Sequence, residues 1–147
     1  MSNLAGILTL RRLVAAWSDS SQEEAARFVD SHRDLLPRRI TSAQLYGLVN
    51  VVRSAHCFAD VQRFVRHQGK KAERAGRRDV ANYWEEVDQT LSSLRNNAKK
   101  LQQLIDSLPL TVDPQSGLDM LHLQLAGEFV QHLIAHSLYW SPIPKER

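Results

Sequence analysis

Two histidines near the C-terminal end of the chain have the spacing of metal ligands. His132 and His136 are four residues apart, and Glu128 lies one helical turn earlier. Zinc proteases, however, place a glutamate between their two histidines as a general base, and this segment has none there. Both histidines and His122 also lie near an apolar face of the predicted helix, formed by Leu125, Phe129 and Leu133. We therefore expect packed, hydrogen-bonded histidines and no metal.

Motifs for catalysis are not found in the sequence. It has no Gly-x-x-x-x-Gly-Lys phosphate loop, no Gly-x-Ser-x-Gly nucleophile elbow and only one cysteine, Cys57. His56 directly precedes Cys57, but adjacent residues of a helix point about 100° apart and do not form a nucleophile and its base. The sequence therefore predicts neither an enzyme nor a bound cofactor.

The segment from Arg63 to Arg78 is the most one-sided in charge. It carries seven Lys and Arg residues against one acid, Glu73. At about 100° per residue, most of these cations fall within roughly a third of the circumference of a helix. They are Arg63, Arg66, Lys70, Lys71 and Arg74, and the line extends to Arg77 and Arg78 if the helix continues that far. The opposite side is apolar, with Phe58, Val61, Phe64, Val65, Ala72 and Ala75.

This cationic stripe predicts an anionic partner. A helix built only for solubility more often carries Glu and Lys one turn apart, and such pairs are scarce here. Lys and Arg at helical spacing bind phosphates and give affinity without reading the base sequence. We therefore predict that the seven cations bind a nucleic-acid backbone. The alternative is a cationic face that is only solvated.

The composition is typical of one globular cytoplasmic domain. A chain of 147 residues can bury a core without disulfides or metals, and its 6 glycines and 5 prolines are few. A single cysteine in an apolar context fits a reducing compartment and predicts that Cys57 is a small core residue. The most apolar stretch, Leu4 to Trp17, is interrupted by Arg11 and Arg12 and is too short to span a bilayer. We expect no membrane partner.

Apolar residues recur at helical spacing along the chain, and no segment alternates as strands do. The sequence predicts an all-α, single-domain bundle of five or six helices over residues 1–140, with a disordered tail over 141–147. A first helix is expected from Ser2 or Asn3 to Trp17. A second is expected after Ser20 and Ser21, because Glu23 and Glu24 follow at the spacing of a capping box. Pro37 ends it.

Three further helices are predicted from local signals. Thr41, with Gln44 as its capping-box partner, begins one helix, and the basic helix begins near Phe58 or Ala59. Gly76 breaks that helix, and Asp79 is a candidate cap for the next. The last helix, about Ser116 to Tyr139, is apolar on two sides, so we expect it centrally or at an interface.

The helix after Gly76 carries a coiled-coil pattern. Its apolar residues alternate four and three apart over about four heptads. They are Val80, Trp84, Val87, Leu91, Leu94, Ala98, Leu101, Ile105 and Leu108. This heptad stripe can pack within the chain, or it can recruit a helix of another protein. The second possibility makes the protein a helical protein–protein adaptor, whose basic face would meet an acidic protein.

Three stretches form a combination known from one family. They are the helix start Thr41-Ser-Ala-Gln-Leu, the basic segment Arg63 to Arg78 and the closing Phe129-Val-Gln-His-Leu-Ile-Ala-His-Ser-Leu-Tyr139. Together they resemble the small helical subunit of type III CRISPR effector complexes, a five- or six-helix bundle. The resemblance implies a non-catalytic structural subunit of an antiviral-defense ribonucleoprotein. Its partners would be the guide and target RNA backbones, held by the basic segment, other effector subunits and copies of itself.

Overall fold

A computed structural model describes the backbone of residues 2–36, 38–104 and 114–139, and the side chains of 8–36, 38–104 and 117–138. All regular elements of this part are helices, which confirms the predicted all-α bundle. They are α1 (Ser2–Ser31), α2 (Ser42–Ser54), α3 (Phe58–Arg74), α4 (Arg78–Leu104) and α5 (Pro114–Tyr139). The predicted tail, and the end of the heptad stripe at Ile105 and Leu108, lie outside the described residues.

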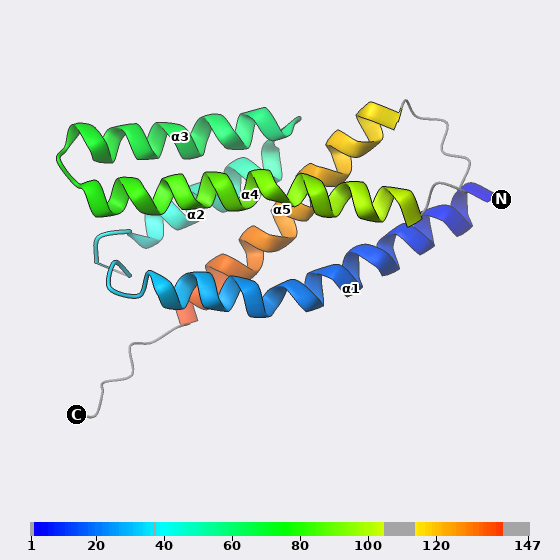
Figure 1. Cartoon of the computed structure of the whole chain (residues 1–147), viewed down its shortest axis with the longest axis horizontal. Coiled ribbons are helices and arrows are strands. Elements are labelled where there is room, and N and C mark those ends of the chain that lie inside the picture. Colours follow the sequence, from blue (N-terminus) through cyan, green and yellow to red (C-terminus); the bar gives the residue numbers. More distant parts are fainter. Residues whose placement is uncertain (1, 37, 105–113, 140–147) are drawn as a thin grey trace.

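The bundle is built around α5 (Figure 1). Helices α3 and α4 form an antiparallel hairpin, α1 runs beside α4, and α5 crosses obliquely behind α4. α5 contacts α1, α2, α3 and α4, and its buried residues include Leu125, Phe129 and Leu133. The central position predicted from its two apolar sides is therefore confirmed.

α1 is one continuous helix from Ser2 to Ser31. The prediction of two separate helices in this region is therefore wrong. Ser20 and Ser21 do not cap a new helix. Their hydroxyls donate backward to the carbonyls of Trp17 and Ser18, both at 2.8 Å. The buried positions continue through the serines at helical spacing, at Val14, Ser18, Ser21, Ala25 and Val29. This unbroken buried face outweighs the local capping signal.

The structure confirms two of the three local signals that mark where helices begin and end. The capping box at α2 is confirmed: Gln44 N–H donates to Thr41 Oγ1 at 3.2 Å, and Thr41 N–H donates to Gln44 Oε1 at 3.0 Å. Gly76 lies in the α3–α4 turn with a φ of +74°, which an L side chain rarely adopts. Helix α4 already begins at Arg78, so Asp79 lies in its first turn and does not precede it.

The heptad stripe of α4 is used within the chain. Its described members, from Val80 to Leu101, are all buried, and α4 packs on α3 and α5. Tyr83 and Trp84 are buried in the same core. The expectation for Cys57 is wrong, because Cys57 is exposed directly before α3. Tyr46 on α2 is also exposed. Among the described helices, none combines the length and apolarity that a membrane crossing requires.

Candidate nucleic-acid interface

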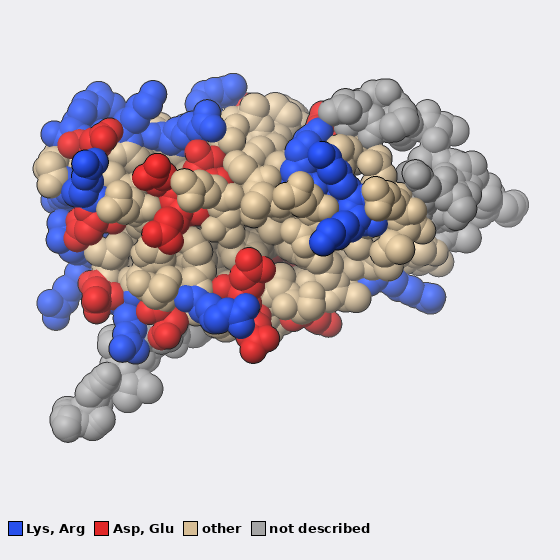
Figure 2. Space-filling view, in the orientation of Figure 1, with Lys and Arg blue, Asp and Glu red and all other residues tan. Residues whose placement is uncertain are grey.

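Helix α3 has the two faces that its sequence predicted. Val61, Val65 and Ala72 are buried, and the helix packs mainly on α4. Phe58 and Phe64 are partly buried, whereas Ala75 is exposed at the end of the helix and does not belong to the docked face. The predicted cations of α3 are all exposed. Figure 2 shows Lys and Arg side chains gathered along the outer edge of the molecule, over α3.

The last two predicted cations do not continue the helical line. α3 ends at Arg74, Arg77 lies in the turn, and Arg78 opens α4. Arg78 Nη1 pairs with Glu73 Oε2 at 3.6 Å. Arg77 and Arg78 therefore extend the stripe around the end of the hairpin, because the left-handed Gly76 reverses the chain there.

Two cations in the first part of α3 have carboxylate partners. Arg63 Nη1 lies 3.1 Å from Asp60 Oδ1, and Arg66 Nε lies 2.9 Å from Asp88 Oδ2. Sequence reasoning missed both acids. Asp60 is three residues before Arg63 and could have been found from helical spacing, whereas Asp88 is brought in from α4 by the packing of the hairpin.

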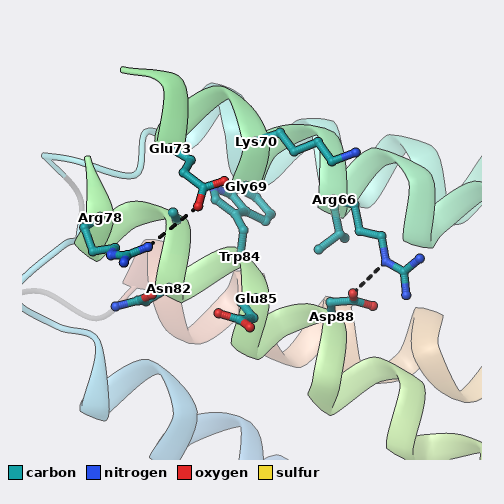
Figure 3. A pocket seen from close by; sticks show the side chains of 11 residues that line it. Arg66, Gly69, Lys70, Glu73, Arg78, Asn82, Trp84, Glu85 and Asp88 are labelled. Carbon is teal, nitrogen blue, oxygen red and sulfur yellow. Dashed lines mark hydrogen bonds and ion pairs between the residues drawn. The ribbon is translucent and has the colours of Figure 1, made fainter. Parts of the chain in front are cut away.

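Asp88 is the centre of a polar network that orients Arg66. Gln62 Nε2 donates to Asp88 Oδ1 at 3.3 Å and to Ser92 Oγ at 3.0 Å, and Ser92 Oγ donates to Asp88 Oδ1 at 3.3 Å. Arg66 donates to Asp88 through Nε (Figure 3), and its two terminal nitrogens make no hydrogen bond with a described residue. Arg66 is therefore positioned for an anion, although the pair as a whole is neutral.

Asp60 is fixed by the backbone before α3. The backbone N–H of His56 donates to Asp60 Oδ2 at 3.2 Å. This hydrogen bond is the main cause that lowers the pKa of Asp60, and Arg63 lowers it further. The carboxylate therefore stays ionised and holds Arg63.

The remaining cations have no carboxylate partner in the described part of the chain. Seven cations less the three paired ones, Arg63, Arg66 and Arg78, leave four. These unpaired cations are Lys70, Lys71, Arg74 and Arg77. Arg74 Nε contacts only the Lys70 carbonyl, at 3.4 Å. The uncompensated positive charge is thus concentrated in the second half of α3 and its turn.

A shallow groove follows the stripe. Its volume is about 410 Å³. It is lined by Ala59, Gln62, Arg63, Arg66, His67 and Lys70, with no carboxylate in its lining. The groove connects the paired arginines with the first unpaired lysine, and its chemistry suits phosphate oxygens.

A second, smaller group of cations lies over the C-terminal half of α4 (Figure 2). Arg95 pairs with Asp119 at 2.8 Å, whereas Lys99 and Lys100 are exposed and make no ion pair within the described residues. The stripe on α3 is larger than this second group, and Lys99 and Lys100 offer a matched comparison for Lys70 and Lys71.

The histidines expected to be packed behave differently from one another. Ser18 Oγ donates to Glu128 Oε1 at 2.8 Å and lies 2.7 Å from His132 Nε2. Because the single hydroxyl proton is used on Glu128, His132 Nε2 must donate. An Nε2 that carries a proton is no base for Ser18, so this contact is structural. His136, contrary to expectation, makes no hydrogen bond with a described residue.

His122 is the most buried of the six histidines that the structure describes. Its Nε2 donates to the Leu91 carbonyl at 2.9 Å, and its ring stacks on Phe58 with centroids 4.0 Å apart. Burial is the main cause that lowers the pKa of His122. Over the described residues, no group of three or more His, Cys, Asp or Glu side chains is arranged to hold a metal ion.

No protein-family model, no curated protein and no solved structure matches this chain. The resemblance to a CRISPR effector subunit therefore stays a prediction.

Proposed function

We propose that this protein binds the sugar-phosphate backbone of RNA through the outer face of α3 and the turn that follows, without chemistry of its own. The observation that carries the proposal is the group of four unpaired cations next to two arginines that are held in place by carboxylates. A rigid helix that is docked by its apolar face presents these side chains without further ordering of the backbone.

The length of the surface suits several phosphates. Arg63 and Arg74 are eleven residues apart, which is about 16 Å at a rise of about 1.5 Å per residue. Arg77 extends the surface beyond the helix end. A flexible single strand can adjust its phosphates to this spacing, and backbone contacts impose no base sequence.

The number of unpaired cations determines the expected salt dependence. For single strands, log affinity falls against log salt with a slope of about −0.7 for each neutralised phosphate. Four unpaired cations then give a slope of about −3, and seven would give about −5. A neutral ion pair releases no net counterion, so we expect the smaller slope.

A matched charge reversal tests the site. Lys70→Glu/Lys71→Glu should weaken binding of a labelled single-stranded RNA by roughly 100-fold or more at about 0.1 M salt, because two attractions become repulsions. Lys99→Glu/Lys100→Glu changes the net charge equally, in an adjacent and exposed lysine pair on α4. Fluorescence anisotropy should show less than about a fivefold loss for this control. Equal losses in the two variants would reject α3 as the binding surface.

The biological setting is a further proposal that rests on the sequence resemblance alone. In it the RNA is the guide or target strand of a type III CRISPR effector complex, and the protein is a structural subunit that contacts other subunits and copies of itself. Effector genes beside the gene for this chain would support this setting, and an unrelated gene neighbourhood would speak against it.

The adaptor alternative loses its main support. Its recruiting surface was the heptad stripe, and the described members of that stripe are buried against this chain's own helices. A partner helix could reach them only if the bundle opened. Capture of a partner that survives high salt would favour an adaptor, because backbone electrostatics do not survive it.

A further inference from the structure

A pocket beside the stripe lies between α3 and α4 and differs from the stripe in its chemistry (Figure 3). Its volume is about 250 Å³. Val65, Gly69, Ala81 and Trp84 form its apolar part. A Cβ at Gly69 would lie 3.5 Å from Trp84 Cβ, so the glycine brings the two helices close together. The space suits one small ring system.

Two ion pairs close the ends of this pocket. Arg66 and Asp88 form one end, at 2.9 Å, and Glu73 and Arg78 form the other, at 3.6 Å. Figure 3 shows both pairs bridging α3 and α4. Because these charges satisfy one another, the recognition chemistry falls to the groups between the two pairs.

The groups between the two pairs carry opposite charges on opposite walls. Lys70 comes from α3, whereas Asn82 and Glu85 come from α4. Neither Lys70 nor Glu85 has an ion-pair partner in the described part of the chain. Trp84 contributes apolar surface to the pocket. Its indole Nε1 is itself buried and has no acceptor among the described residues. A fitting ligand therefore combines an anion for Lys70 with a hydrogen-bond donor for Glu85 and an acceptor for the Asn82 amide.

We propose that this pocket holds one unstacked nucleobase of the strand whose backbone follows the stripe. The adjoining phosphate binds Lys70, and an exocyclic amino group of the base donates to Glu85. Cytosine presents such an amino group together with a carbonyl acceptor, whereas uracil has no amino group. The inference rests on the proposed function, and it adds a preference for single strands, because base pairing occupies the same edge of the base.

Two homopolymers of equal length test the pocket. In anisotropy titrations, the wild-type protein should bind single-stranded oligocytidine about tenfold more tightly than oligouridine, because only cytosine has an amino group that can donate to Glu85. A tenfold difference corresponds to about 1.4 kcal/mol. Glu85→Ala should reduce this preference to less than about twofold. Glu24→Ala removes an exposed carboxylate on α1, away from the pocket, and should leave the preference for oligocytidine unchanged. Glu24 and Glu85 are both exposed, so both variants should fold, and circular dichroism should verify this.

The sign of the Glu85 effect separates the pocket from pure backbone binding. If only the backbone is bound, loss of a carboxylate beside the stripe should tighten both strands. If the pocket holds a base, the same loss should weaken oligocytidine. Equal affinity of the wild-type protein for the two strands, or tightening of both by Glu85→Ala, would overturn the pocket and leave the proposed function intact. Binding of neither strand would overturn the proposed function itself.

A free nucleotide has the same chemistry as one unit of the strand, and a competition distinguishes the two sources. Cytidine monophosphate should displace labelled oligocytidine only at a concentration at least about 100-fold higher than unlabelled oligocytidine, because it lacks the phosphates that reach Lys71, Arg74 and Arg77. Displacement at equal concentrations would overturn the assignment to a strand.

Discussion

The two halves of α3 carry the same kind of side chain in different electrostatic states. In the first half, Arg63 and Arg66 each have a carboxylate within 3.1 Å. In the second half and the turn, Lys70, Lys71, Arg74 and Arg77 have none among the described residues. A count of cations along the sequence treats the halves as equal. The difference teaches that the positive potential of the stripe comes mainly from its second half.

The first half is also the better anchored of the two. Phe58 stacks on the buried His122, Asp60 accepts the His56 backbone N–H, and Asp88 joins Arg66 to α4 through Gln62 and Ser92. We infer a division of roles within one helix: the first half positions its arginines, and the second half attracts the phosphates.

Neutral substitutions should show the largest difference in RNA affinity between the two halves of α3. Lys70→Gln/Lys71→Gln removes two unpaired cations and should weaken single-stranded RNA binding about 25-fold at about 0.1 M salt, with a slope shallower by about 1.4. Asp60→Asn/Arg63→Gln removes a neutral pair from the first half. It should change affinity by less than about twofold, as measured by anisotropy. A loss in this variant as large as that in the lysine variant would mean that the halves do not differ.

The turn that carries Arg77 should be sensitive to its glycine. Gly76→Ala should lower the free energy of unfolding by about 1–2 kcal/mol, because its φ is +74° and no atom within 4 Å would contact the new methyl group. Gly69→Ala is the matched control in the helical interior of α3, where Cβ meets Trp84 Cβ at an ordinary 3.5 Å. Urea unfolding should show this control to be more stable, by up to about 1 kcal/mol. Destabilisation of both variants alike would contradict the strain at Gly76.

Loss of the ion pair between Arg66 and Asp88 should give the first half of α3 an unpaired cation, as in the second half. Asp88→Asn keeps a side chain of similar size for Gln62 and Ser92 but releases the charge of Arg66. Single-stranded RNA should bind about three- to fivefold more tightly at about 0.1 M salt, with a slope steeper by about 0.7. Ser93→Asn, on the exposed side of α4, is a control that alters no charge. Unchanged affinity of Asp88→Asn would show that Asp88 does not restrain Arg66.

His122, on which Phe58 of the first half stacks, should make the stability of the protein depend weakly on pH. The pKa of His122 is lowered in the folded protein, mainly by burial, from an ordinary value of 6.5. As pH falls below 6.5, the unfolded histidine takes up a proton before the folded one does, so stability should decrease. Neighbouring Arg95 also lowers the pKa, whereas the Leu91 carbonyl and Asp119 raise it.

His122→Gln removes this titration and should reduce the loss of stability between pH 7.5 and pH 5, measured by urea unfolding at each pH. We expect this to be the smallest of the four effects, since one shifted group contributes it. An identical loss in the wild-type protein and the variant would show that His122 does not contribute.

Periodicity predicted most of the fold. The buried stripe of α4 and the central α5 follow from apolar spacing, and the capping box at Thr41 follows from local chemistry. The boundary near Ser20 was predicted wrongly because a capping signature is local, whereas the buried face from Val14 to Val29 depends on packing against α5. Cys57 was misplaced for a similar reason: its apolar neighbours lie in the sequence and not around it in space.

The candidate site was predictable as a set of residues but not as a charge distribution. Helical spacing grouped the cations of α3 correctly. It could not show that Asp88 neutralises Arg66, because the two are 22 residues apart and meet only through the α3–α4 packing. It also could not show the pocket at Trp84, which needs both helices and the close approach at Gly69.

The most direct test of the account is the salt dependence of wild-type binding to a labelled single-stranded RNA, measured by fluorescence anisotropy over several salt concentrations. We predict a slope of log affinity against log salt of about −3, as four unpaired cations require. A slope near −5 would show that the paired arginines count equally, which would contradict the difference between the two halves of α3. A slope near zero, or no binding at low salt, would contradict the proposed function as a whole.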